Sequence, residues 1–458
     1  MGATRRPDRL LAYVVGSQRL EQPAGTAAHM GFDWEHQLTS TATAMLTVNP
    51  DWSQIEAAHT GIDFTYVERV LPELRPFFVE SVPYLPVGII FYPSGRIRRF
   101  EEGLKLTGTE GRFRFGVLEM LGVERFEPAS PENDLAMRLW YDFSHETYFN
   151  VSEVHSKTDD CTHYELVHEH KGAVNVRSVA AYYLQSSDLP DHGGGLTAVR
   201  TRASTEKWIG QIAYMDVGDN FNPALGYVSH RGVREWNTYV YREINPKPHT
   251  TWFESAEIGG SYIRADDHTG KLNYEDSYAS LYLRQSATLS VGGGPDRYRH
   301  PGTAGNIFDD LTWNVWANIC ERQPTSAWAG ATIGTIEESG YQNYWVGGGA
   351  RTRDDRLAGD ISLEWTRYSR RNSLSLHGPE EDAHQYTLGA VYRLGKHTSF
   401  ALSERWLTQG LESRTIFNAV LHRQYGVDHD LYVVLGDPQN PNETVRQVTF
   451  KYVMPLGR

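Results

Sequence analysis

The chain has 458 residues, a net charge of −13 and a mean hydropathy of −0.50. This polar average excludes a bundle of membrane-spanning helices, each of which needs about 20 consecutive apolar residues. The acidic balance, without any basic stripe, excludes nucleic acid as a partner. A membrane β-barrel is compatible with the composition, because only alternate strand residues face lipid. The 26 Tyr, 12 Trp and 17 Phe suit the aromatic girdles of a barrel or, equally, a soluble sugar-binding β-protein.

Two features precede the main run of strands. The short apolar segment Leu10–Gly16 has no small-residue cleavage site after it, so it predicts a strand and not an export signal. Residues Pro50–Ser81 then depart from strand alternation, with a polar cluster followed by a proline-flanked, doubly aromatic run. If the strands close into a barrel, we expect this segment to fold inward as a plug. Its candidate plug or lumen residues are Asp51, Ser53, Gln54, Glu56, Glu73, Arg75, Phe77 and Phe78.

These plug residues have alternative interpretations. The oxygen-rich run from Asp51 to Glu56 would also suit Ca²⁺, or its side chains would bond their own backbone in an ordinary loop. We expect a plug or structural role and no metal. Arg75, between proline and aromatic residues, would pair with a lumen carboxylate; the alternative is an exposed arginine at the rim.

The rest of the chain alternates apolar and polar residues in segments bounded by turns. At Gln385–Leu394 the apolar residues recur at every second position, whereas a helix would need them three and four apart. Similar segments recur at residues 112–120, 135–142, 162–170, 173–184, 207–216, 235–242, 278–284, 311–319 and 361–368. The pattern predicts an all-β, large antiparallel transmembrane β-barrel of about 18–22 strands, an even number being favoured. We expect one barrel domain over residues 1–458, with residues 50–81 inserted in it.

Connections of two kinds support a barrel. Short ones are predicted at Glu110-Gly111 and Gly395-Lys396. Long ones, rich in Gly, Pro, Asp and Asn, are predicted at residues 187–195, 266–271, 292–306, 351–359, 377–382 and 436–443. Outer-membrane barrels have short turns at one rim and long loops at the other. A β-propeller would instead repeat a blade motif at a fixed period, and no such motif occurs.

Few residues are candidates for chemistry. His168 and His170 share one face of a predicted strand, but the sequence identifies no third metal ligand. Cys161 and Cys320 form neither a metal motif nor a disulfide framework, and a single disulfide and two free thiols both stay open. Motifs for nucleophilic hydrolases, zinc proteases and nucleotide binding do not occur. We predict no catalytic, cofactor-binding or metal residues.

A run of turn-forming residues follows the predicted strand at 207–216. Asp219, Asn220, Phe221, Asn222 and Pro223 predict a structured turn held by side-chain hydrogen bonds to the backbone. Sugar binding is the alternative, because Asn, Asp and aromatic side chains also serve that purpose.

Three blocks of sequence carry a resemblance. The first is LTVNPDWSQIEA at 46–57 with PELRPFF at 72–78; the second comprises residues 96–97, 103–108 and 112–116; the third is GDNFNPALGYV at 218–228. In this order they resemble the C-terminal barrel domain of a bacterial outer-membrane family of unknown function. In that family the barrel usually follows a domain similar to carbohydrate-binding module family 9. Full-length members carry a signal peptide and this N-terminal domain, so we expect a truncated or internally started form.

The sequence therefore predicts a non-enzymatic outer-membrane β-barrel that serves transport or anchors a surface activity. The alternative is a soluble or secreted carbohydrate-active or carbohydrate-binding β-sheet protein. The expected partners are outer-membrane lipid, the barrel-assembly machinery and a glycan or small solute; no cofactor is expected. The C-terminal residues Met454–Arg458 lack the terminal aromatic that barrel assembly commonly reads.

Overall fold

The computed structural model describes residues 8–20, 25–50, 76–79, 81–86, 88–125, 131–172, 175–188, 194–245, 254–285, 288–302, 305–320, 323–354, 356–368, 382–409, 412–436 and 446–456. Its first strands and two short helices are β1 (Arg9–Arg19), β2 (Thr26–Gln37), β3 (Ala42–Val48), α1 (Pro76–Val79), α2 (Pro93–Arg96), β4 (Ile97–Arg99), β5 (Glu102–Glu110), β6 (Phe113–Arg125), β7 (Glu132–Asp142), β8 (Thr147–His155) and β9 (Asp159–Lys171).

The strands continue as β10 (Val176–Asp188), β11 (Gly194–Ser204), β12 (Trp208–Val217), β13 (Val233–Ile244), β14 (Ser255–Asp267), β15 (Leu272–Gln285), β16 (Leu289–Pro301), β17 (Ile307–Ile319), β18 (Thr325–Ile336), β19 (Ser339–Arg351), β20 (Leu357–Tyr368), β21 (Asp382–Gly395), β22 (Thr398–Gln409), β23 (Glu412–Gly426), β24 (His429–Leu435) and β25 (Gln447–Pro455). Within the described ranges no helix has the length and apolar character to cross a membrane.

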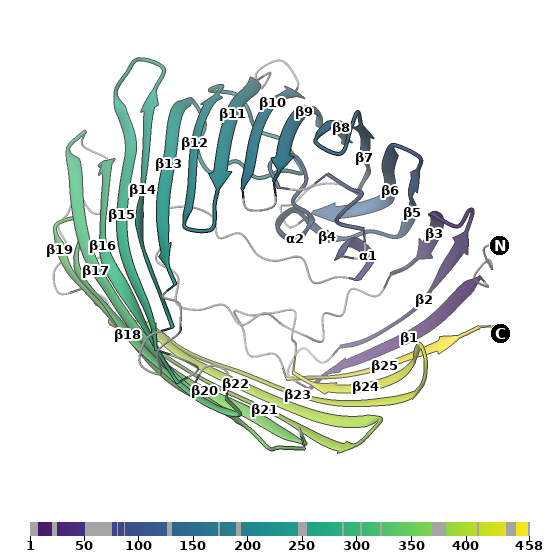
Figure 1. The fold of residues 1–458 in the computed structure, drawn as a ribbon. Coiled ribbons are helices and arrows are strands. Elements are labelled where there is room, and N and C mark those ends of the chain that lie inside the picture. Colours follow the sequence, from purple (N-terminus) through teal and green to yellow (C-terminus); the bar gives the residue numbers. More distant parts are fainter. Residues whose placement is uncertain are drawn as a thin grey trace.

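The strands form one closed antiparallel ring (Figure 1). Each strand of the ring pairs with the next one, with β3 pairing directly with β5, and β25 pairs with β1, which closes the ring. The short β4 pairs only with β6, so the ring holds 24 of the 25 strands found in the described residues. An all-β closed barrel is confirmed, whereas the predicted count of about 18–22 strands is too low. Strands with several small residues, such as the three glycines of β16 or the Ala and Gly residues of β18, give a weak alternation signal.

Strand β1 starts and strand β25 ends at the same rim of the barrel, here called the terminal rim; the other is the loop rim. The connections at the terminal rim are short except for residues 245–254. The longest connections lie at the loop rim, at residues 49–101, 218–232, 369–381 and 436–446. Five of the six predicted long connections also fall at the loop rim; the sixth, at 351–359, lies at the terminal rim, and its last residues already belong to β20.

The predicted connection at 292–306 is mostly wrong, because Gly292–Pro301 belongs to β16. The Gly-Gly-Gly-Pro run has the composition of a turn but serves a close contact between strands. A Cβ atom on Gly294 would lie 1.8 Å from the carbonyl oxygen of Ala279 on β15. The register between β15 and β16 is interrupted at this point, as expected where proline removes a ladder donor.

Candidate functional site

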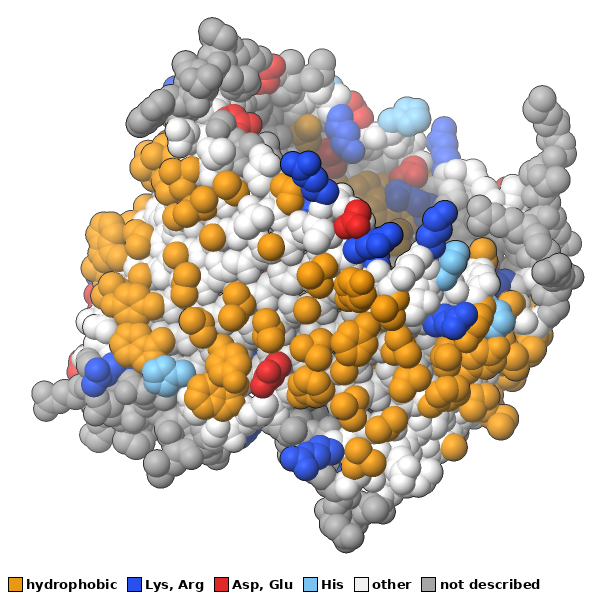
Figure 2. All heavy atoms as spheres, turned by 90° about the horizontal axis from the view of Figure 1, so that it is seen from below, with side chains coloured by type: hydrophobic (Ala, Val, Ile, Leu, Met, Phe, Trp, Pro, Cys, Tyr) orange, Lys and Arg blue, Asp and Glu red, His pale blue; other side chains and the backbone are white. Residues whose placement is uncertain are grey.

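The outer face of the wall is apolar. Side chains on β17 alternate, and Leu311, Trp313, Val315 and Ile319 face outward with exposed fractions of 43, 56, 55 and 50%. Figure 2 shows similar side chains spread as a broad band over one face of the molecule, with charged residues near its margins. All described strands belong to one sheet, so these side chains have no second sheet to pack against. A contiguous apolar surface of this extent fits an apolar surrounding.

Aromatic residues bound this outer belt in two rows. Three strands each carry two outward aromatic residues six positions apart in the sequence. One of the two lies near the terminal rim and the other near the loop rim. The pairs are Trp208 with Tyr214, Tyr386 with Tyr392, and Phe400 with Trp406. Six residues span about 20 Å of strand. Rings of neighbouring strands touch within the loop-rim row, with centroids 4.9 Å apart for Tyr214–Trp236 and 5.1 Å for Tyr386–Trp406.

Inside the ring, the described residues between 76 and 101 lie against the wall near the loop rim, where Figure 1 shows α1, α2 and β4. Phe77 and Phe78 are 7 and 2% exposed and belong to a buried cluster with wall residues such as Leu118. Lys105 on β5 donates a hydrogen bond to the Phe77 carbonyl at 2.8 Å. A Cβ atom on Gly116 of β6 would lie 2.3 Å from a carbonyl oxygen of this segment, so the backbone runs directly over the wall.

A second inward segment, residues 218–228, packs on the first. Phe221 and Leu225 are 0 and 1% exposed within the same cluster. The Tyr92 amide donates to the Leu225 carbonyl at 2.6 Å, and the Tyr227 amide donates to the Ile89 carbonyl at 3.1 Å. The two connections thus form a joint inner assembly at the loop rim.

The predicted plug residues and the predicted turn residues lie in different parts of the chain. Asp51, Ser53, Gln54, Glu56, Glu73 and Arg75 lie outside the described residues, and Phe77 and Phe78 lie in the buried cluster. Asp219, Asn220, Phe221, Asn222 and Pro223 lie in the second inward segment. The buried carboxylate of Asp159 accepts hydrogen bonds from the Ala224 amide at 2.9 Å and the Ser186 hydroxyl at 2.8 Å, which fixes that segment to the wall.

The histidine and cysteine candidates form no site. His168 and His170 do share the outer face, where their Nδ1 atoms lie 2.9 Å from Thr147 Oγ1 and 2.7 Å from Glu146 Oε1. The described part of the chain holds no group of three or more metal-ligating side chains. Cys161 and Cys320 are both free thiols, and Cys161 is buried in the inner cluster.

Below the inner assembly, arginines and aromatic rings line the lumen on β6, β7 and β8. The guanidinium carbon of Arg114 lies 3.8 Å from the centre of the Trp140 ring, and that of Arg138 lies 4.8 Å from it. Tyr148 stacks on Trp140 with 3.8 Å between ring centroids. Each cation over a ring contributes about 0.5–2 kcal/mol, more where water is excluded.

The row continues along the neighbouring strands. Asn150 accepts from Arg138 Nε at 3.0 Å and donates to Glu165 at 3.0 Å. On β10 and β11, Arg200 lies 5.5 Å from the centre of the Tyr182 ring. We call these residues the arginine ladder. None of its residues was predicted from the sequence, although Arg138 and Trp140 occupy alternate positions of a strand whose other face is apolar, which was a readable signal.

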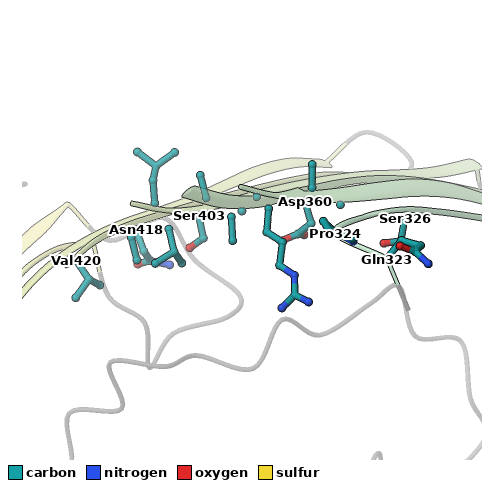
Figure 3. A pocket seen from close by; sticks show the side chains of 17 residues that line it. Gln323, Pro324, Ser326, Asp360, Ser403, Asn418 and Val420 are labelled. Atoms are coloured by element: carbon teal, nitrogen blue, oxygen red, sulfur yellow. The ribbon is translucent and has the colours of Figure 1, made fainter. Parts of the chain in front are cut away.

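Across the lumen, β18–β23 have a wall of small side chains. A shallow recess of about 490 Å³ lies against Ser326, Asp360, Ser403 and Asn418. Figure 3 shows Gln323, Asn418 and Val420 on the same side of these strands. The lumen is therefore polar and cationic on one side and polar with small residues on the other.

Comparisons with known proteins bear on the fold. No family model and no curated protein matches the chain. The siderophore receptor PirA from Pseudomonas aeruginosa has a TM-score of 0.50 at 9% identity, covering 99% of this chain and 81% of that one. PirA from Acinetobacter baumannii gives 0.45 at 8% identity over 100 and 81%, and OpdL from Pseudomonas aeruginosa gives 0.31 at 9% over 98 and 98%. At such identity the first likeness shows a shared large-barrel fold and nothing finer; the two lower scores carry no argument.

Proposed function

We propose that the protein is an outer-membrane β-barrel that passes a solute through its lumen. The observation that carries this proposal is the apolar outer belt, bounded by two aromatic rows, on a closed ring with a polar interior. Backbone groups in hydrocarbon must all be paired, and only a closed ring of strands achieves this. The even strand number and the terminal rim of short connections agree with such barrels.

The height of the outer apolar belt is close to that of the apolar band on outer-membrane barrels. On β17 the outward apolar residues run from Leu311 to Ile319. These eight residue steps span about 27 Å of strand, or about 21 Å along the barrel axis at a tilt of roughly 40°. Outer-membrane barrels carry an apolar band about 25 Å tall. The terminal rim would then face the periplasm and the loop rim the outside.

We infer transport and not anchoring from the lumen wall. An anchor needs no ordered charges inside, whereas the arginine ladder holds cations at fixed positions facing the channel. The fold shared with a protein described as a siderophore receptor supports a transport role. We also propose that residues 50–81, continuing the described inner assembly, form a partial plug at the loop rim.

Migration on a gel tests membrane insertion. The detergent-refolded chain is run with and without boiling, and the unboiled band is expected to migrate faster because a closed barrel resists detergent. Solubility and a monomeric state in buffer without detergent, with no shift on boiling, would contradict the proposal. Conductance in planar bilayers then tests passage: discrete steps are expected, and insertion without conductance would leave a barrel that is closed or serves as an anchor.

A further inference from the structure

Aromatic rings on the lumen wall sit on glycines of the neighbouring strand. Trp328 on β18 pairs with Gly347 on β19. Two positions along, Gly330 on β18 pairs with Trp345 on β19. A Cβ atom on Gly330 would lie 2.2 Å from Cζ2 of Trp345, and one on Gly347 would lie 2.5 Å from Cε2 of Trp328. Each ring therefore lies close against the glycine backbone, leaving its other side free to face the lumen.

The same arrangement recurs on other strands. Trp316 on β17 is in register with Gly292, where a Cβ atom would lie 2.7 Å from the ring. Tyr241 on β13 is in register with Gly259, where a Cβ atom would lie 2.4 Å from Cδ1 of the tyrosine ring. Tyr282 on β15 lies beside Trp316, with ring centroids 5.5 Å apart. We call Tyr241, Tyr282, Trp316, Trp328 and Trp345 the aromatic track.

The aromatic track follows the lumen wall near the terminal rim. Tyr241, Tyr282, Trp316 and Trp328 each lie three residues from the strand end at this rim. The track crosses six strand spacings from β13 to β19, or about 29 Å. It is therefore long enough to contact several units of a chain-like ligand at once. All five side chains are partly exposed, in contrast to the buried aromatic residues at the loop rim.

The surroundings of the track are polar, with Glu257 beside Tyr241 and Arg284 beside Tyr282 as charged neighbours. The inward positions of β17 and β18, all within the described residues, carry Asn, Thr and Ser, one carboxylate at Asp310, and no Lys or Arg. Asn314 donates to Thr332 at 2.9 Å, and the Tyr282 hydroxyl accepts from Arg284 at 2.7 Å. Amides and hydroxyls beside ring faces suit a ligand with an apolar C–H face and many hydroxyl groups. The guanidinium carbon of Arg284 lies 5.4 Å from the centre of the Tyr282 ring, whereas on the arginine ladder three arginines lie over aromatic rings and offer an anion more cations.

We propose that the aromatic track binds neutral oligosaccharides, whose sugar rings stack on the ring faces while their hydroxyls bond to the adjacent amides and hydroxyls. This inference rests on the proposed transport function, since it names the solute class that the lumen would pass. Rings seated on glycines stand out little into the channel, so a sugar chain can move from one ring to the next.

The test titrates the detergent-refolded full chain with maltohexaose, cellohexaose, xylohexaose and mannohexaose by calorimetry and tryptophan fluorescence. At least one is expected to bind and to protect tryptophan from quenching by acrylamide. Trp328→Ala and Trp345→Ala should each weaken binding about tenfold or more. Trp313→Ala is the matched control, because Trp313 is 56% exposed on the outer face of β17 and should leave affinity unchanged.

Several results would overturn the inference. They are absence of binding by all four sugars up to about 10 mM, equal losses with Trp313→Ala, or preferential binding of benzoate, a planar anion, at the same tryptophans. The acrylamide measurement uses the unaltered protein, so a variant that fails to fold leaves the inference testable. Conducting channels without sugar binding would refute the track alone, whereas sugar binding by a chain that neither inserts nor conducts would refute the transport function.

Discussion

Single glycines decide where aromatic side chains lie on the lumen wall. At Gly330 the ring of Trp345 occupies the space that a side chain would need. At Gly347 the ring of Trp328 occupies that space. Gly16 on β1 differs, because a Cβ atom there would meet nothing within 4 Å. Both kinds of glycine lie inside strands, but only the first is required by packing.

Gly330→Ala is expected to destabilise the barrel by about 1–3 kcal/mol, because the new methyl group forces the Trp345 ring off the wall. Urea unfolding in lipid vesicles, followed by tryptophan fluorescence, measures the change. Gly16→Ala is the control and should be neutral or slightly stabilising. Equal effects of the two substitutions would show that ring seating is not the cause.

His268, in the turn between β14 and β15 at the loop rim, is a pH-dependent contact. Its Nε2 lies 2.9 Å from Asp216 and its Nδ1 lies 3.2 Å from Asp219. The hydrogen bond to Asp216, with that to Asp219, raises the pKa of His268 above its usual 6.5. Since the folded-state pKa is the higher one, the stabilisation is full below pH 6.5 and is lost as pH rises through the raised pKa.

His268→Gln should therefore remove this pH dependence. In the unaltered protein, limited proteolysis of the 218–232 connection is expected to be slower at about pH 5.5 than at about pH 8.5. In the variant the proteolysis rates at the two pH values should become similar. Both rates are first corrected for the pH dependence of the protease itself, measured on an unfolded substrate. An unchanged ratio would mean that the histidine does not hold this connection.

Among the elements, the inner assembly depends on a few buried rings. Phe78 is 2% exposed, and its ring centroid lies 5.4 Å from that of Phe77, 6.1 Å from Phe91 and 6.2 Å from Phe100. Val79, the next residue of α1, is 44% exposed. These contacts join α1 to Phe91 and Phe100 of the same inner assembly, and the helix itself, only four residues long, contributes little of its own stability.

Phe78→Ala should loosen the inner assembly by about 3–5 kcal/mol while leaving the ring of strands closed. The faster migration of the unboiled protein should persist, and conductance in planar bilayers should rise. Val79→Ala, in the same helix, should change neither. If both variants conduct as the unaltered chain does, the assembly does not limit passage.

The strands were largely predictable from sequence, and the failures have physical causes. Alternation at Gln385–Leu394 correctly indicated β21, because one face meets the outer surroundings and the other the lumen. It failed at Gly292–Pro295, where close strand approach required turn-like residues inside β16. The arginine ladder and the aromatic track depend on register between strands. A single segment does not reveal register, although Trp-x-Gly at 328–330 and again at 345–347 was a readable signal.

At the scale of the whole molecule, the outer belt requires apolar side chains, whereas the lumen wall accepts polar ones at nearby positions of the same strand. Val315 faces outward at the middle of the belt with an exposed fraction of 55%, and Thr312 faces the lumen on the same strand. In water an exposed valine tolerates a charge, whereas in hydrocarbon a charge is costly. The pair therefore reports on the surroundings of the barrel.

Val315→Arg is expected to cost about 2–4 kcal/mol of folding free energy in lipid vesicles, and Thr312→Arg close to none. Refolding into vesicles across a urea series measures both. A neutral Val315→Arg would show that the belt does not lie in hydrocarbon and would count against the proposed function.

The seam between β1 and β25 has a consequence for the order of folding. The Leu456 amide bonds to the Leu10 carbonyl at 2.7 Å, and Arg9 reaches Asp428 at 2.6 Å, so the two ends of the described chain complete each other. Closing this seam brings together residues about as distant in sequence as the chain allows, which makes it a slow, late event. Until β25 is present, β1 and β24 are unpaired edges open to other chains. Because the first and last described residues are neighbours, a short linker could join β25 to β1, and opening another turn of the terminal rim would move this late seam to a different pair of strands while keeping the ring closed.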